Sequence, residues 1–308
     1  MRLRSAAVSD DTDSTRRLGA TELRVGPVAY GCWRFSGTDV ATATEKIETA
    51  LDCGMNLIDT ADIYGFDGTA GFGDAEELLG RVLAGSPGLR DRMVLATKGG
   101  IRKPVPYDQS ATYLARACED SLRRLGVDHV DLYQVHRPDV LTHPADLAAT
   151  LTSLVERGLV REVGLSNFTV AHTRAVLAHL ERPLATTQPQ FSALHTEPLD
   201  DGTLDLCCEV GTTPLAWSPL AGGRLATAPE DERAARVAPV LDRLAEREGV
   251  DRSAVALAWV MRHPAGAVPI VGSQRPERIR AAAAATRVRL DRRDFYDVLV
   301  ASRGERLP

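Results

Sequence analysis

The sequence of 308 residues contains no apolar run as long as the eighteen or more residues that a membrane-spanning helix needs. Its first residues, MRLRSAAVSDDTDSTRR, lack the apolar block that is typical of a signal peptide. The formal net charge is only −5, which offers no basic surface to nucleic acid or to an anionic membrane. We therefore expect no membrane-spanning helix and neither nucleic acid nor a membrane as a partner.

Cysteine is scarce, and its spacing suggests neither disulfides nor a metal site. The five cysteines are an odd number, and none of them has the C-x-x-C spacing of zinc and redox motifs. Free cysteines of this kind usually behave as small buried apolar residues. We expect reduced thiols, no bound metal and a cytoplasmic protein. The cysteines are Cys32, Cys53, Cys118, Cys207 and Cys208.

Two further absences concern the organisation of the chain. No G-x-G-x-x-G motif follows the first predicted strand, so a Rossmann fold is not indicated. Residues 68–80, GTAGFGDAEELLG, resemble that motif but have Glu where the last Gly belongs, and we interpret them as a mobile lid or spacer loop. No tract rich in Pro, Gly and Ser divides the chain. We predict a flexible tail over residues 1–14 and one domain over residues 15–308.

Short apolar runs alternate regularly with amphipathic helical patterns. Eight such units over about 260 residues predict a (β/α)8 barrel, with a doubly wound open sheet as the alternative. Residues 15–26 predict a small β-hairpin ahead of the barrel. Residues 230–249 and 291–304 predict two extra helices outside the repeat. The predicted strands span residues 28–33, 55–60, 93–98, 130–136, 160–167, 185–191, 213–219 and 267–273.

Polar or aromatic residues end every predicted strand from the second to the eighth, where a barrel opens its active-site mouth. Strands two to four bring Asp59, Tyr64, Lys98 and His136 to this mouth. An ammonium lowers the pKa of a nearby phenol, a carboxylate holds that ammonium in place, and a histidine can hydrogen-bond a substrate oxygen. The set suits general acid catalysis. Taken singly, Asp59 is also a typical helix cap and Lys98 a typical solvated residue. The prediction therefore depends on all four residues falling at the ends of strands two to four.

Six motifs, in order along the chain, are similar to those of the aldo-keto reductases, and nearest to bacterial oxidoreductases of that family. They are DTADIYG, LATKGG, DLYQVHRPD, GLSNF, AWSPLAGGRL and PIVGSQRPERI, and the resemblance extends from about Arg17 to the last helix. It implies a (β/α)8 barrel that binds extended NADPH or NADP⁺ and reduces an aldehyde or ketone, with Tyr64 as the general acid. The partner would then be a small carbonyl compound, which the sequence does not identify, and the family default is a monomer.

The resemblance also implies roles for individual residues. Lys98, held by Asp59, would lower the pKa of Tyr64, and His136 would orient the substrate carbonyl. Trp33 and Phe35 would lie on the substrate side. The implied cofactor-binding residues are Cys32, Trp33, Ser166, Asn167, Gln188, Trp217, Ser218, Leu220, Gly222, Arg224, Gly272, Ser273, Arg275 and Arg278.

The last of the six motifs, PIVGSQRPERI, indicates the form of the cofactor and departs from the family pattern. Arg275 and Arg278 would start the eighth helix, where guanidinium groups suit an extra phosphate, and this favours NADPH over NADH. Many relatives follow with an acidic residue and an amide at the adenine, but this chain has Arg280, Ala281 and Ala282. Gln274 is a candidate replacement.

Two other functions remain open. The same family includes β subunits of potassium channels, so a cofactor-binding regulatory subunit is the alternative to an enzyme. A barrel isomerase or lyase would grip a phosphate without a clamp for the nicotinamide. Asp62 has no assigned role beyond capping or bracing the loop around Tyr64.

Overall fold

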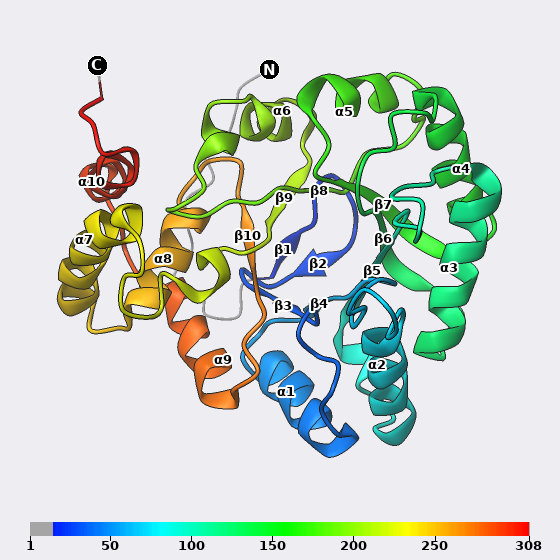
Figure 1. Ribbon diagram of the computed structural model, residues 1–308, viewed down its shortest axis with the longest axis horizontal. Coiled ribbons are helices and arrows are strands. Elements are labelled where there is room, and N and C mark those ends of the chain that lie inside the picture. Colours follow the sequence, from blue (N-terminus) through cyan, green and yellow to red (C-terminus); the bar gives the residue numbers. More distant parts are fainter. Residues whose placement is uncertain (1–14, 308) are drawn as a thin grey trace.

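The strands close into a ring (Figure 1). The computed structural model describes residues 15–307, so the predicted tail over residues 1–14 lies outside the described residues. The parallel strands follow the order β10-β3-β4-β5-β6-β7-β8-β9 and form a closed barrel, which confirms the predicted fold and rules out the open sheet. The strands are β3 (Ala29–Gly31), β4 (Leu57–Asp59), β5 (Val94–Gly99), β6 (Val130–Val135), β7 (Val160–Ser166), β8 (Thr186–Gln188), β9 (Thr213–Ala216) and β10 (Val268–Val271).

Helices cover the outside of the barrel. In α3 (Ala111–Leu125), the Ser110 side chain caps the N-terminus by accepting a hydrogen bond from the Tyr113 N–H, and Gly126, with φ 67°, ends the helix. The crossover helices are α1 (Val40–Asp52), α2 (Asp74–Gly85), α3 (Ala111–Leu125), α4 (Pro144–Glu156), α5 (Val170–Leu177), α6 (Thr203–Val210), α8 (Arg252–Met261) and α9 (Pro276–Ala283).

The two extra helices predicted outside the repeat are present. They are α7 (Glu232–Glu248) and α10 (Arg292–Arg303), which pack side by side beyond the ring of crossover helices (Figure 1). In the residues that the structure describes, no helix has both the length and the apolar character required to cross a membrane.

The interpretation of residues 68–80 as a lid or spacer loop is wrong in its second half. Helix α2 begins at Asp74, so the loop after Tyr64 ends at Gly73. Leu78 and Leu79 are buried on the inner face of α2, and this apolar pattern was already visible in the sequence. The glycines in front of the helix concealed its start, because Gly73 occupies the N-cap with φ 95° and supplies no capping side chain.

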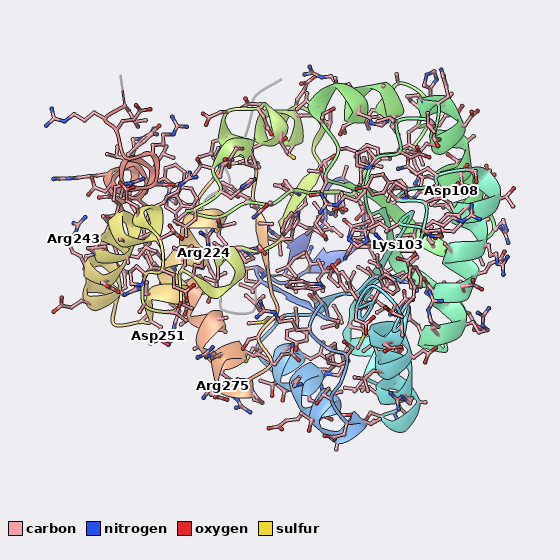
Figure 2. The ribbon with its side chains drawn as sticks, in the orientation of Figure 1. Lys103, Asp108, Arg224, Arg243, Asp251 and Arg275 are labelled. Carbon is pink, nitrogen blue, oxygen red and sulfur yellow. The ribbon has the colours of Figure 1, made fainter. Side chains whose placement is uncertain are left out.

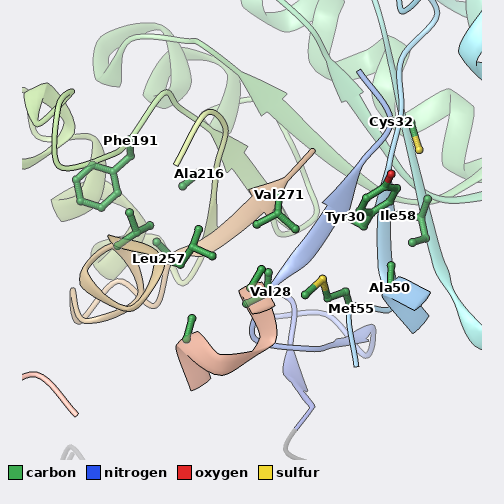
Figure 3. Packing of buried hydrophobic residues seen from close by; sticks show 14 of the residues in the cluster. Val28, Tyr30, Cys32, Ala50, Met55, Ile58, Phe191, Ala216, Leu257 and Val271 are labelled. Atoms are coloured by element: carbon green, nitrogen blue, oxygen red, sulfur yellow. The ribbon is translucent and has the colours of Figure 1, made fainter. Parts of the chain in front are cut away.

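Two apolar clusters form the core, one inside the barrel and one between strands and helices. Along β5, Val94 and Ala96 belong to the interior cluster, whereas Leu95 belongs to the outer one. Figure 3 shows part of the outer cluster around Tyr30 and Ile58. This alternation turns every second side chain inward, so polar residues that continue the inward series reach the barrel mouth.

The predicted N-terminal hairpin, β1 (Arg16–Arg17) and β2 (Arg24–Val25), is confirmed. It projects onto the middle of the ring in Figure 1 and adds Leu18 to the interior cluster. The N–H of Gly26 donates to the Asn56 side chain at 2.8 Å, just before β4 begins. The hairpin therefore closes the N-terminal end of the barrel, and the opposite end remains for a site.

Candidate active site

An ion pair lies at the C-terminal end of the barrel interior. The Lys98 Nζ is 2.7 Å from Asp59 Oδ2 and also donates to the Thr60 carbonyl at 2.7 Å. Lys98 is fully buried, and Asp59 is almost so. Burial acts to lower the pKa of Lys98, but the charges of Asp59 and Tyr64 act the other way and prevail, so the pKa is raised. The ammonium is therefore a fixed positive charge.

Two amide side chains orient the Asp59 carboxylate. Gln188 Nε2 donates to Asp59 Oδ1 at 3.1 Å, and Gln134 Nε2 donates to the same oxygen at 3.3 Å. Gln134 in turn accepts a hydrogen bond from Thr186 at 2.9 Å. The sequence interpretation missed Gln134, although its position on β6, two residues after the inward-facing Leu132, places it in the inward series.

Tyr64 lies over this pair from the loop that follows β4. The Lys98 Nζ is 4.8 Å from the centroid of the Tyr64 ring. Burial raises the pKa of the phenol, and the Lys98 ammonium opposes that rise. The lysine thus acts in the expected direction, but burial is the larger effect and leaves the phenol protonated.

His136 faces Tyr64 across the end of the cavity. The two ring centroids are 5.7 Å apart, with the rings nearly perpendicular. Burial lowers the pKa of His136 well below its usual value, and the charges of Lys98 and Arg137 lower it further. The imidazole is therefore neutral, and it can hydrogen-bond a substrate oxygen without adding a charge.

A cavity of about 950 Å³ opens above these residues. Its wall includes Asp59, Tyr64 and His136, whereas Lys98 lies beneath it, fully buried. The cavity extends to Asp251 before α8 and to Arg275 before α9, which Figure 2 places on the same side of the molecule. A long cavity with chemistry at one end suits an extended ligand that brings one reactive group to Tyr64.

Polar residues next to Asp59 and His136 form one connected group on the cavity wall. The Ser166 hydroxyl donates to the Gln188 carbonyl at 3.0 Å and accepts from Asn167 Nδ2 at 2.8 Å. Asn167 Oδ1 accepts from Trp217 Nε1 at 2.9 Å. All four residues line the cavity. The structure therefore brings together four of the residues predicted to bind the cofactor.

The far end of the cavity offers groups that suit phosphates. Backbone with positive φ at Ser218 (49°), Ala221 (50°) and Gly222 (74°) curves the loop after β9, and such curved backbone can direct N–H groups toward an anion. Arg275 and Arg278 lie at the first turn of α9. Of the predicted residues here, the structure places Ser218, Leu220, Gly222, Gly272, Ser273, Arg275 and Arg278 in the wall.

Three predicted contact residues lie elsewhere. Arg224 is not in the cavity wall; it points to Asp231, with 2.6 Å between Nη1 and Oδ2. Cys32 and Phe35 are fully buried in the outer apolar cluster and do not reach the cavity. Trp33, between them, is 60 % exposed and lines the mouth. These last three residues follow β3 in a turn that is closed by the Phe35 N–H donating to the Cys32 carbonyl at 3.0 Å, so the local backbone and not strand alternation sets the direction of each side chain.

Other wall residues were not anticipated. Arg34 and Arg137 bring two guanidinium groups to the wall. That of Arg34 donates to the Gly222 carbonyl at 3.5 Å, and that of Arg137 lies 5.8 Å from the Trp217 ring centroid. Gln274, the candidate for the adenine contact, does line the wall, but its side-chain oxygen accepts from Lys46 at 3.0 Å. Within residues 15–307, no cluster of histidine, cysteine or acidic side chains could hold a metal ion.

The fold and the site together define a (β/α)8 oxidoreductase that acts on a carbonyl group. Comparison with known proteins agrees: the aldo/keto reductase family pattern matches residues 27–299, and the chain belongs to that family. The chain is 54% identical to a 6-dehydroglucose reductase of Novosphingobium aromaticivorans over 95% of its own length and 97% of the relative's. It is 37% identical to a 6-dehydroglucose reductase of Agrobacterium fabrum, covering 92% and 96% of the two chains.

Solved structures with the same architecture include the glycerol dehydrogenase of Gluconobacter oxydans. It is 27% identical to this chain, with a TM-score of 0.83 and coverage of 97% and 98% of the two chains. The family generally uses a nicotinamide cofactor.

Proposed function

We propose that this protein is an NADPH-dependent reductase that converts an aldehyde or ketone to an alcohol, with Tyr64 as the general acid. The observation that carries the proposal is the buried ion pair of Lys98 and Asp59 beneath the Tyr64 phenol, at the closed end of a long cavity. A protonated phenol beside a fixed ammonium can give up its proton to a developing alkoxide, because the ammonium stabilises the phenolate that remains.

Each residue has a defined part in this reaction. Tyr64 donates the proton to the carbonyl oxygen, and Lys98 stabilises the phenolate. Asp59 keeps the ammonium in place, and neutral His136 orients the oxygen from the other side. The bound cofactor supplies the hydride.

The cofactor would lie along the cavity. Ser166, Asn167 and Gln188 would hold the carboxamide of the nicotinamide, and Trp217 would form the face against its ring. Arg275 and Arg278 would hold the extra phosphate that distinguishes NADPH from NADH. Since Gln274 is engaged by Lys46, Ala281 and Ala282 would instead offer the adenine an apolar surface.

We further propose that the substrate is an oxidised sugar that carries its aldehyde on a polyhydroxylated chain. Two relatives that cover nearly the whole chain are 6-dehydroglucose reductases. The cavity presents Arg137 beside His136, the rim residue Trp33, and Arg34 next to Trp33. Guanidinium groups donate hydrogen bonds to hydroxyls, and an exposed indole suits the apolar face of a sugar ring.

The test combines binding with turnover. A panel of carbonyl compounds, including 6-dehydroglucose and an apolar aldehyde of similar size, is assayed by NADPH consumption for the wild type and Tyr64→Phe. The variant should bind NADPH with near-normal affinity in a fluorescence titration and lose most turnover. Retained turnover in Tyr64→Phe would disprove the acid role, and equal kcat/KM for both aldehydes would disprove the sugar preference.

A further inference from the structure

The backbone of Tyr64 is held by α2 across a glycine-rich loop. The loop spans residues 65–73 and contains four glycines, a composition that by itself leaves the backbone much freedom. The Ala75 N–H, in the first turn of α2, donates to the Tyr64 carbonyl at 3.1 Å. Gly65 and Gly71 meet at the base of the loop, where a Cβ on Gly65 would lie 2.8 Å from the Gly71 oxygen. The placement of Tyr64 therefore depends on α2.

The next residue of α2, Glu76, is a fully buried carboxylate that the proposed reaction does not use. Its Oε1 accepts a hydrogen bond from the Thr97 hydroxyl at 2.5 Å. Its Oε2 accepts from Arg124 Nε at 2.7 Å. Arg124 comes from α3 and is itself mostly buried, with 13% of its side chain exposed. The carboxylate thus connects α2, α3 and β5, and the guanidinium compensates its charge.

Thr97 immediately precedes Lys98 on β5. Because side chains alternate along a strand, Thr97 faces α2 while Lys98 faces the barrel interior. Glu76 consequently accepts a hydrogen bond from the residue next to Lys98 on β5. Its neighbour Ala75 donates a hydrogen bond to the Tyr64 carbonyl. Ala75 and Glu76, two adjacent residues of α2, thus connect the Tyr64 backbone to Thr97, the residue before Lys98.

We propose that Glu76 is a positioning residue for the reduction, which fixes the Tyr64 phenol relative to the Lys98 ammonium through its hydrogen bond to Thr97. The inference rests on the proposed function, since it gives Glu76 a role only if Tyr64 is the acid. Catalysis is sensitive to such placement, and a displacement of about 1 Å can cost on the order of 100-fold in rate.

The packing around the bridge leaves Arg124 little freedom. A Cβ on Gly73 would lie 2.5 Å from Arg124 Cδ, and one on Gly80 would lie 2.2 Å from the Arg124 carbonyl oxygen. These glycines let α3 approach α2 closely enough for the guanidinium to reach Glu76. Burying an ion pair generally contributes little to stability, whereas its directed hydrogen bonds can select one arrangement of the chain.

The test uses a matched pair of variants on the strand. Thr97→Val removes the hydroxyl donor at nearly constant volume, and Thr97→Ser keeps it. Glu76→Ala removes the acceptor, and Glu77→Gln, at the exposed next position of α2, is the control. The measurements are the single-turnover rate of NADPH oxidation across pH, the affinity for NADPH by fluorescence and the thermal unfolding midpoint.

We expect Thr97→Val and Glu76→Ala to lower the single-turnover rate roughly 10- to 100-fold, with NADPH affinity unchanged within about threefold. The basic limb of the rate profile should move to higher pH, because a phenol farther from Lys98 has a higher pKa. Thr97→Ser should restore both the rate and the limb, and Glu77→Gln should match the wild type.

A purely structural role predicts the opposite pattern. If Thr97→Val lowers only the unfolding midpoint and keeps the wild-type rate and pH limb, the proposal is overturned. This comparison needs only Thr97→Val and Thr97→Ser, so it stands even if Glu76→Ala does not fold. Turnover retained in Tyr64→Phe would instead refute the proposed function, so the two failures are distinguishable.

Discussion

The ammonium of Lys98 lies 2.7 Å from the carboxylate of Asp59, and both groups are buried at the end of the barrel interior. Neither would be stable there alone, since an unpaired charge in such a place loses its hydration without compensation. The pair therefore has two consequences that separate variants can distinguish, one for catalysis and one for stability.

Replacing Lys98 by Met should abolish turnover and also destabilise the fold. The variant leaves Asp59 without its cation, and breaking a buried pair in this way typically costs about 3–5 kcal/mol. The double variant Lys98→Met/Asp59→Asn should recover much of that stability but none of the activity. Urea unfolding and NADPH consumption measure the two effects. Equal stability of the single and double variants would contradict this account, because removing Lys98 would then leave no unpaired charge behind.

The placement of these residues shows how far the sequence alone could lead. The positions of Asp59 and Lys98 at the ends of neighbouring strands followed from the alternation of strands and helices, because a barrel brings strand ends together. Their hydrogen-bond partner Gln134 was missed, because an amide in mid-strand resembles many others until its neighbours are known.

The errors have a common physical origin. Cys32, Phe35 and Arg224 were assigned to the cavity from their motifs, but the direction of a side chain in a loop depends on backbone torsions that no motif specifies. The start of α2 was obscured for a similar reason, since Gly73 replaces the usual capping side chain. The strands, by contrast, have a fixed alternation, which correctly predicted that Asp59 and Lys98 face inward.

The preference for NADPH should depend on Arg278. This guanidinium lies on the cavity wall in the first turn of α9. The change Arg278→Gln removes one charge-assisted hydrogen bond to the extra phosphate and should weaken NADPH binding about tenfold, while NADH binding stays nearly constant. Arg280→Gln, on the same helix but not in the wall, is the control. Fluorescence titration with both cofactors measures the ratio, and equal weakening of both would place Arg278 away from that phosphate.

The pH dependence of reduction should lack an ionisation near pH 6.5. Burial, together with the charges of Lys98 and Arg137, lowers the pKa of His136 well below that value. The imidazole therefore remains neutral from pH 6 to pH 9. Any change of the reduction rate that its protonation causes falls below this range. Because the folded protein resists protonation of His136, stability is lost as the pH falls below the unfolded pKa of about 6.5. A rate profile with a limb near pH 6.5 that disappears in His136→Gln would contradict this assignment.

The buried Asp62 carboxyl should lower the free energy of unfolding at neutral pH. This residue neither caps a helix nor reaches the cavity. The side chain is 1% exposed, and within residues 15–307 neither carboxyl oxygen has a hydrogen-bond partner. Burial, and secondarily the charge of Glu76, raise its pKa well above the usual value, although Arg124 opposes the shift. A raised folded-state pKa means that stability is full below the unfolded pKa of about 3.9 and falls as the pH rises toward the folded value.

The change Asp62→Asn removes this titration while it keeps the shape of the side chain. The free energy of unfolding of the variant should exceed that of the wild type by about 1–3 kcal/mol at pH 7, because folding of the wild type must then protonate a carboxyl that is ionised in the unfolded chain whereas the amide needs no proton, and by less at pH 4. Asp67→Asn is the matched control, because Asp67 is exposed and accepts the N–H groups of Thr69 and Ala70. It should give no such gain.

Urea unfolding at a series of pH values measures the difference between Asp62→Asn and the wild type. A variant less stable than the wild type at pH 7 would mean that Asp62 is ionised and paired. Turnover should be unchanged in Asp62→Asn, because the proton that the reaction needs comes from Tyr64.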